Sequence, residues 1–256
     1  MIVAALGILT AAAYVAAVRA YRVRFPARRF PASRVACFLA GVAAMTTVLL
    51  PAADALADRF LTAHMMQHLV LTLIGPPLLL LGAPLSLAVA LVPVRAARAI
   101  ARGVRFPPVH ALLAPPVALT IFVAVLWIAH FSPLYEAALG VEWIHAMEHL
   151  LFVGTALLFW TTVVQVGYVP RPAAFAIRMF ALFVAIPQGA FLGLAIYAAH
   201  RPLYAHYAAQ MTLANALVDQ RDGGATMWIG GGGVLLCALL LTAGAWAARE
   251  RREAAA

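Results

Sequence analysis

Long apolar runs, separated by short polar or arginine-containing segments, dominate the pattern of hydrophobic positions along the chain. An α-helix needs about 20 mostly apolar residues to cross a membrane, and seven runs approach or reach that length. They are Ile2 to Val18, Val35 to Leu50, Leu61 to Leu81, Val109 to Phe131, Val141 to Val166, Met179 to His200 and Ala225 to Ala247. The pattern predicts an all-α fold, a polytopic membrane helix bundle with seven transmembrane helices.

The third run is followed by a shorter apolar stretch, Pro84 to Val92, which cannot span a membrane alone. Because proline interrupts helical hydrogen bonding, Gly75-Pro76-Pro77 is expected to break the third helix. The stretch is then re-entrant or interfacial, or it extends the helix past a kink. Membrane helices tolerate such breakers when neighbouring groups satisfy the freed backbone, so the third helix should pack inside the bundle.

Composition supports the membrane assignment, with 65% hydrophobic residues, 11% charged residues and a mean hydropathy of +0.95. These values lie far outside the usage of soluble globular domains. Residues 1–256 are therefore predicted to form a single transmembrane helical domain. The first run is expected to be a helix rather than a signal peptide, since no basic residue precedes it and no clear cleavage site follows it.

The 18 basic residues are all arginines, and they alternate from one connection to the next. This alternation is expected when the arginine-rich connections lie on the cytoplasmic side of the membrane. It predicts that the amino terminus is outside and the carboxyl terminus is in the cytoplasm. The predicted inner arginines are Arg19, Arg22, Arg24, Arg28, Arg29, Arg34, Arg95, Arg98, Arg102, Arg105, Arg171, Arg178, Arg249, Arg251 and Arg252. Topology and contact with the lipid bilayer explain the net charge of +9, so no nucleic-acid partner is predicted.

Histidines gather at the opposite, outer ends of the predicted helices, and only His110 lies on the inner side. Residues four apart share one helix face, with Cβ atoms about 6 Å apart, so paired imidazoles can hold one ion or straddle two. An ionisable residue in a span is costly unless it is paired. The sequence therefore predicts a metal site in the outer leaflet, with His64, His68, His145 and His149 as principal ligands and His130 as a fifth.

The residues around these histidines narrow the choice of ion. Glu148 lies within a span and should be a ligand, a partner of a ligating imidazole or a proton carrier. Imidazole with thioether from Met65 or Met227 favours copper, as Cu(I), whereas imidazole with carboxylate would suit zinc or iron. One bis-histidine haem b between the third and fifth helices is an alternative. Cys37 and Cys237 lie away from the histidines, so neither a thiolate site nor a disulfide is predicted.

Several motifs, in order over roughly residues 55 to 245, carry a resemblance to a known family. They are His64-Met65-Met66-Gln67-His68, Gly75-Pro76-Pro77 running to Gly82-Ala83-Pro84-Leu85, Trp127-x-x-His130-x-x-Pro133, His145-x-x-Glu148-His149 and Asp219-Gln220-x-x-Gly223-Gly224-x-x-Met227-Trp228. The chain resembles the caa3-type cytochrome c oxidase assembly factor (CtaG-like) family. One departure is the spacing of Trp127 and His130, which the family pattern places side by side.

The resemblance implies a multi-span assembly factor needed to make active haem-copper oxidase, with a part in handling its copper. It also implies a bacterial cytoplasmic (inner) membrane location and partners among the oxidase subunits or a periplasmic copper carrier. Carried over by position, its motif residues are His64, His68, His130, His145, Glu148, His149, Asp219, Gln220 and Met227. Asp219 and Glu148 are expected to orient imidazoles or collect the incoming ion. No enzymatic turnover is required.

Two other functional classes remain as alternatives. His145-x-x-Glu148-His149 has the form of an inverted zinc-peptidase motif, in which two histidines bind zinc and the glutamate acts as base. The second pair carries Gln67 in place of the acid, which favours shared ion binding over one catalytic base. A b-type haem-binding redox protein is the other alternative.

Overall fold

The computed structural model describes residues 1–255, and the side chains of these residues except Leu134. This part of the chain is helical and contains no strand, which confirms the predicted all-α class. The helices are α1 (Ile2–Arg24), α2 (Ala32–Val48), α3 (Pro51–Arg59), α4 (Leu61–Leu69), η1 (Val70–Ile74), α5 (Gly75–Leu81), α6 (Pro84–Leu91), α7 (Val94–Arg105), α8 (Pro107–Leu112), α9 (Pro115–Phe131), α10 (Pro133–Gly140), α11 (Glu142–Val163), α12 (Phe175–Ala198), α13 (Ala205–Gln210), α14 (Leu213–Ala225), η2 (Thr226–Gly231) and α15 (Gly232–Ala254). The segments η1 and η2 are π-helical and continue the helices on either side of them.

Five of the described helical segments are long and apolar enough to cross a membrane. They are Ile2–Arg24, Leu61–Leu91, Glu142–Val163, Phe175–Ala198 and Leu213–Ala254. The pair α2 and α3, bent by 55°, would make a sixth. The fourth predicted run is shorter than expected: α9 has 17 residues, because Ala114 before Pro115 is extended and separates α8 from α9. A helical membrane protein is thus supported, while the count of seven spans stays a prediction.

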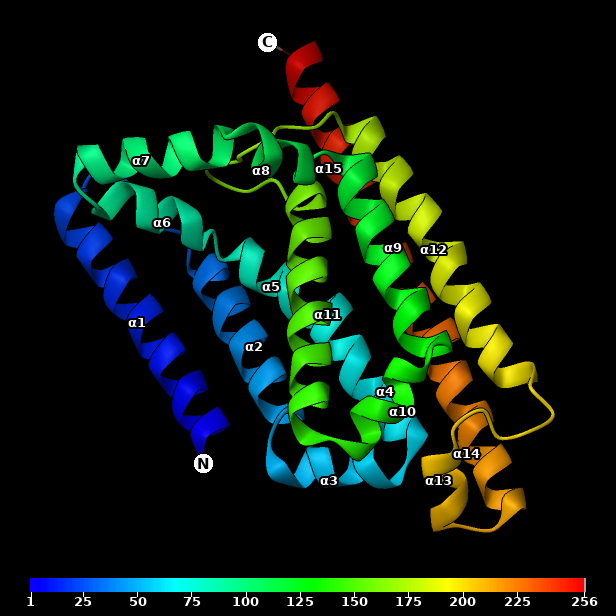
Figure 1. Ribbon diagram of the computed structural model, residues 1–256. Helices are drawn as coiled ribbons and strands as arrows, with labels where there is room; N and C mark the ends of the chain where they lie inside the picture. Colours follow the sequence, from blue (N-terminus) through cyan, green and yellow to red (C-terminus); the bar gives the residue numbers. More distant parts are fainter. Residues whose placement is uncertain (256) are drawn as a thin grey trace.

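The third helix is not broken at Gly75-Pro76-Pro77, as the sequence had suggested. Pro76 has no N–H to donate to the carbonyl of Thr72, and that carbonyl accepts a hydrogen bond from Trp160 Nε1 at 2.8 Å instead. The interruption lies at Ala83, whose φ of 51° is left-handed. Beyond it, α6 runs on towards α7 (Figure 1), so the stretch after Pro84 extends the third helix past a displaced kink.

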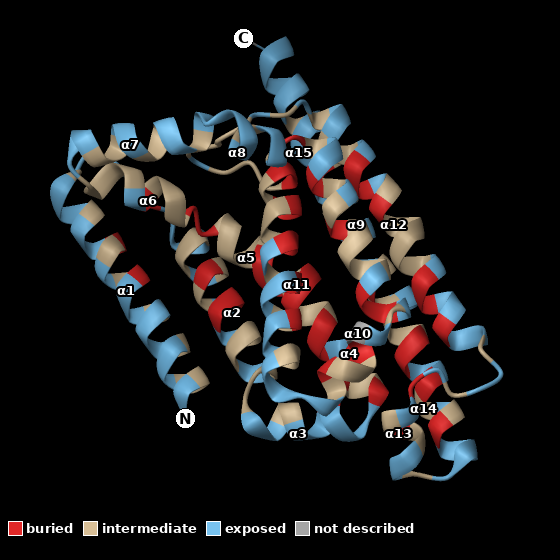
Figure 2. Cartoon of the chain, viewed as in Figure 1, coloured by how far each residue is buried: buried red, intermediate tan, exposed pale blue. Residues whose placement is uncertain are grey.

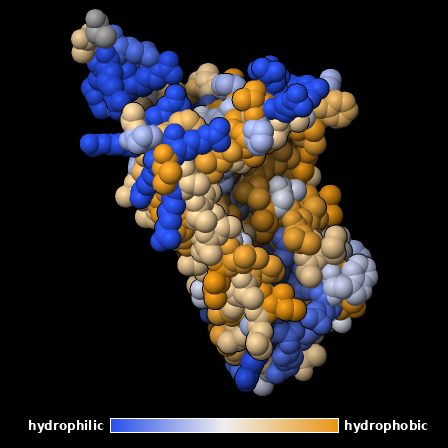
Figure 3. Space-filling model, turned by 90° about the vertical axis from the view of Figure 1, so that its left-hand side faces the viewer, coloured by the Kyte–Doolittle hydropathy of each residue, from blue (hydrophilic) through white to orange (hydrophobic). Residues whose placement is uncertain are grey.

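The two ends of the bundle carry different residues. Figure 1 shows α7 and the carboxyl terminus at one end, which we call the arginine end, and α3, α10 and α13 at the other, which we call the histidine end. Apolar residues occupy the middle of the face seen in Figure 3, between hydrophilic residues at the two ends. The segregation of arginines that topology predicted is therefore present in three dimensions. Which end faces the cytoplasm stays a prediction.

Helix α11 packs against α9, α5 and η1 with one face and leaves its other face exposed. Buried residues concentrate on α11, α4 and the inner face of α12 (Figure 2). Phe159 and Trp160 of α11 join Phe122 of α9 and Leu182 of α12 in one apolar cluster. This packing fixes the depth and rotation of the two helices that carry the paired histidines, α4 and α11.

Candidate metal centre

Helices α4 and α11 bring the two predicted histidine pairs together at the histidine end. The ring centroids are 4.2 Å apart within each pair, and those of His64 and His145 are 5.2 Å apart. His64 and His68 are buried, whereas His145 and His149 are half-buried. Imidazoles distant in the sequence therefore converge into one compact group, with the α11 pair closer to solvent.

The nitrogen and carboxylate atoms form two overlapping groups with the spacing of metal ligands. One contains His64, His145 and His149, and the other contains His64, His68 and Glu148; within each group the donor atoms all lie within 4.8 Å of one another. His64 belongs to both groups. The arrangement offers two adjacent coordination positions, one near the surface and one buried.

His130, at the end of α9, lies beside these groups without joining either of them. Its ring centroid is 5.7 Å from that of His68. Its Nδ1 is 2.8 Å from the carbonyl oxygen of Leu126, to which it donates a hydrogen bond, so Nε2 carries the lone pair. That Nε2 is buried and has no hydrogen-bond partner among the described residues. His130 can thus supply a donor after a small adjustment.

Tyr207 of α13 holds His64 in place, a contact that sequence reasoning did not identify. The Tyr207 hydroxyl lies 2.9 Å from the Ala57 carbonyl oxygen and 2.9 Å from His64 Nδ1. Since the hydroxyl donates to the carbonyl, His64 Nδ1–H donates to the hydroxyl, and His64 Nε2 keeps its lone pair for the cluster. Burial raises the pKa of Tyr207 above its ordinary value, so it remains a neutral phenol. The only sequence signal was a tyrosine close to His206.

Unpaired polar atoms surround this group of imidazoles. His64 Nε2 is 2.8 Å from His68 Nε2. In the described part of the chain, Nε2 of His145, Nε2 of His149 and both carboxylate oxygens of Glu148 are buried without a hydrogen-bond partner. Glu148 Oε2 lies 3.9 Å from His68 Nε2. Burying polar atoms unpaired costs roughly 1–3 kcal/mol each, and a cation bound at either group would pair with the donor atoms of that group.

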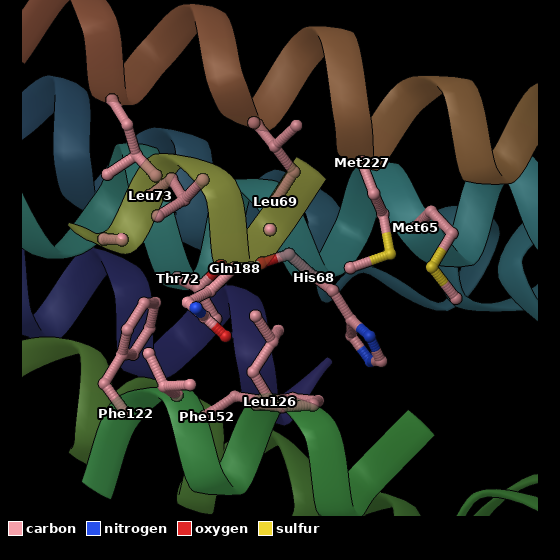
Figure 4. Close-up of a pocket in the computed structure, with 15 residues that line it drawn as sticks. Met65, His68, Leu69, Thr72, Leu73, Phe122, Leu126, Phe152, Gln188 and Met227 are labelled. Carbon is pink, nitrogen blue, oxygen red and sulfur yellow. Dashed lines mark hydrogen bonds between the residues drawn. The ribbon is translucent and has the colours of Figure 1, made fainter. Parts of the chain in front are cut away.

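A cavity of about 40 Å³ adjoins His68 on the side away from the surface. Figure 4 shows Met65, Met227 and His68 side by side along its wall. Met65 is fully buried, whereas Met66 and Met147 are more than half exposed. Of the methionines near the pairs, Met65 and Met227 are therefore the ones placed to offer thioether sulfur to an ion at His68.

Asp219 of α14 caps the helix that carries two of the histidines. Its carboxylate accepts hydrogen bonds from Leu61 N at 2.6 Å, Thr62 N at 3.2 Å and Thr62 Oγ1 at 2.7 Å. These donors lie at the amino terminus of α4, where backbone N–H groups lack intrahelical partners. The Asp219 carboxylate thus positions the start of α4. Gln220, next to it, bonds the backbone of Ile196, Arg201 and Leu203.

Replacing Asp219 by alanine should loosen α4. We expect the D219A variant to lose about 1–2 kcal/mol of unfolding free energy, the typical cost of removing a helix cap. Hydrogen–deuterium exchange of the amides of Leu61 and Thr62 should rise in parallel. Asp222→Ala, an exposed position on the same helix, is the matched control and should leave both measurements unchanged. Unaltered exchange in D219A would contradict the capping role.

Two glycines of α14 allow this helix to pack closely against α12 and α4. A Cβ added to Gly224 would lie 2.6 Å from the backbone oxygen of Gly193. One at Gly223 would meet side-chain atoms of Leu61 and Met65 at 3.2 and 3.4 Å. Gly223 and Gly224 thus permit close helix packing, whereas added Cβ atoms at Gly232 and Gly233 would meet nothing within 4 Å.

The histidines outside the cluster have ordinary structural roles or lie apart from it. His206 Nε2 contacts Asp58 Oδ1 at 3.0 Å and the Asp58 carbonyl oxygen at 3.0 Å, which ties α13 to α3 at the surface. The backbone carbonyl of His110 accepts a hydrogen bond from Arg171 at the arginine end. The predicted ligands did not include His206, and the structure places it outside both groups of donor atoms.

Comparison with known proteins places the chain in a family. Residues 12–249 match the family described as cytochrome c oxidase caa3 assembly factor (Caa3_CtaG). Uncharacterized proteins of Mycobacterium bovis and Mycobacterium tuberculosis are each 26% identical over 263 residues, covering 99% of this chain and 40% of their own length. One from Mycobacterium leprae is 25% identical over 248 residues, covering 91% of this chain and 37% of its own length.

The chain thus spans about 40% of the length of the curated relatives it matches. No solved structure matches it significantly. The family match, by contrast, extends over nearly all of the chain and confirms the resemblance carried by the histidine, glycine-proline and Asp219-Gln220 motifs. The protein belongs to the cytochrome c oxidase caa3 assembly factor family, a family of assembly factors and not of enzymes.

Proposed function

We propose that this protein binds copper at the histidine end and assists its delivery to, or insertion into, a haem-copper oxidase. The observation that carries the proposal is the buried Glu148 carboxylate, which lacks a hydrogen-bond partner among the described residues and lies within 4.8 Å of ring nitrogens of His64 and His68. Burying a carboxyl group without a hydrogen-bond partner is unfavourable. A copper ion at this position would bind the Glu148 carboxylate together with the ring nitrogens of His64 and His68.

The donor set favours copper over other ions. Imidazoles outnumber the carboxylate, and the thioethers of Met65 and Met227 line the adjoining cavity. Thioether and imidazole together suit Cu(I), whereas calcium or magnesium would require mainly oxygen ligands. Neither cysteine takes part, since Cys37 and Cys237 lie on α2 and α15, outside the groups of donors.

The overlap of the two groups gives a route for transfer. Copper is first bound by His64 with the half-buried His145 and His149, and then by His64 with His68 and Glu148. Because His64 belongs to both groups, the ion moves between them without being released. Reversal of this path returns copper to the surface for a partner. The partner is an oxidase subunit or a periplasmic copper carrier, and it docks at the histidine end, which faces the periplasm of a bacterial inner membrane.

Metal analysis of detergent-purified protein tests the proposal. The wild-type chain loaded with Cu(I) should retain copper after desalting, while a variant with His64, His68, His145 and His149 changed to alanine should retain none. His206→Ala, which alters the surface contact with Asp58, is the matched control and should retain copper fully. Equal copper in the wild type and the quadruple variant would refute the site, and a Soret absorption band in the purified protein would favour haem instead.

The hydrogen bond from His64 to Tyr207 should contribute to affinity. Tyr207→Phe removes the hydroxyl and keeps the ring, so His64 loses the partner that fixes its tautomer and orientation. Loss of such an outer partner typically lowers metal affinity about 10–100-fold. Competition with a chromophoric Cu(I) chelator measures the change. Tyr197→Phe, at a side chain 41% exposed, should have no effect; an equal effect of both substitutions would contradict the assignment.

A further inference from the structure

A second recess lies on another part of the molecule, between α5, α11, α12 and α15. It is a groove of about 830 Å³ whose wall is mainly apolar, with Leu78, Trp160, Val163 and Leu241 among its residues. None of the clustered histidines lines it. From Ile229 to Ala245 it follows η2 and α15 for roughly 24 Å, at about 1.5 Å per residue. This length and composition suit an extended hydrocarbon chain.

The groove is wide because two of its wall positions have no side chain. Gly230 and Gly233 both line it, and a Cβ added to Gly233 would meet no atom within 4 Å. Cys237, one turn beyond Gly233, also lines the groove and is exposed. In a bilayer such a recess is filled by whatever apolar chain reaches it, and phospholipids surround the bundle.

A single cation marks one end of the groove. Arg178, in the first turn of α12 at the arginine end, is half-buried in its wall. Its Nε donates to the Val163 carbonyl oxygen at 2.8 Å, and its guanidinium lies over the Phe175 ring at 4.6 Å. Among the ion pairs of the described residues, none involves Arg178. A half-buried guanidinium held in place without a carboxylate is suited to a phosphate group.

We propose that this groove binds one anionic phospholipid, with an acyl chain along the apolar wall and the phosphate facing Arg178. Charge favours this occupant over a zwitterionic lipid, whose ammonium group offsets its phosphate. It also favours a lipid over a transmembrane helix of a partner, since an apolar helix would bury the guanidinium without an anion. The proposal is independent of copper binding, because the groove and the histidine cluster share no donor residue.

Native mass spectrometry of the full chain, released from bilayers of equal phosphatidylglycerol and phosphatidylcholine, tests the proposal. The wild type should retain phosphatidylglycerol preferentially. Arg178→Gln should lower that preference about fivefold, the effect of one basic residue at an anionic surface. Gly233→Leu should abolish retention by filling the groove. Gly232→Leu is its matched control, since its added side chain also meets open space but lies off the groove wall; retention should be unchanged.

A second measurement uses the cysteine in the groove. With Cys37→Ser, Cys237 is the sole thiol, and phosphatidylglycerol should slow its reaction with a lipophilic maleimide relative to vesicles of phosphatidylcholine alone. Arg178→Gln should reduce the slowing. Equal retention of both lipids by the wild type, or slowing that is undiminished in R178Q, would overturn the proposal. A copurifying transmembrane polypeptide that protects Cys237 in lipid-free detergent would also overturn it, by showing a protein occupant.

Discussion

Changing His64 alone to alanine should remove copper binding almost as completely as removing both histidine pairs. His64 is common to the two donor groups, so H64A leaves only two donors in each. We expect Cu(I) affinity to fall by more than about 100-fold, beyond the effect of losing an outer partner. Equilibrium competition with a chelator measures affinity, and metal analysis measures the copper retained.

His149→Ala provides the informative comparison with H64A. It removes one donor from the half-buried group and leaves His64, His68 and Glu148 intact. This variant should therefore bind copper more weakly but still measurably, and His206→Ala should match the wild type. If H64A and H149A proved equally mild, the two groups would not share a ligand, and the transfer route through His64 would be wrong.

Replacing Glu148 by leucine should have opposite effects on the metal-free and copper-loaded protein. Glu148 is 2% exposed, and its carboxylate lacks a hydrogen-bond partner in the described structure. An apolar side chain of similar size removes that cost, so metal-free E148L should gain about 1–3 kcal/mol of unfolding free energy. Binding to the native state raises stability by mass action, and this gain from copper should be much smaller in E148L than in the wild type.

Unfolding is measured for the wild type and for E148L, each treated with a chelator or loaded with Cu(I), in the same detergent. The four unfolding free energies give both effects of the substitution. Glu142→Leu is the matched control, because this glutamate lies on the same helix and is exposed. Its effect should stay within about 0.5 kcal/mol in both states. A metal-free E148L protein less stable than the wild type would indicate that the carboxylate is satisfied in the absence of a cation.

Much of the bundle could be predicted because membrane burial constrains sequence strongly. Helix positions followed from apolar runs, and the depth of His64 and His145 followed from the alternation of arginines. The predictions that differ from the structure concern the backbone next to two prolines. At Pro76 the helix continues, since an indole from α11 satisfies the freed carbonyl of Thr72. Before Pro115 the chain leaves the helix, since a proline disfavours the helical conformation of the residue before it, and Ala114 is extended.

The site was predictable at the level of which helices meet, but not at the level of individual contacts. The spacing of His64 and His68 placed both on one helix face, whereas no pattern showed that Tyr207 would bond His64 across 143 positions. The family motif included Asp219, but the sequence did not show which groups its carboxylate would bond. Only the fold shows that its carboxylate caps α4, because the donors of that cap are backbone amides, which every sequence contains.

The cap also bears on the order of events during biosynthesis. Thr62 and Asp219 are 157 positions apart, so a ribosome has made most of the chain before the residue that anchors α4 emerges. Tyr207 appears only shortly before it. A nascent chain that has inserted only its first helices therefore displays paired imidazoles without the restraints that organise them. Under the proposed function, the site for copper is therefore organised late, once α14 has been made and Asp219 has capped α4.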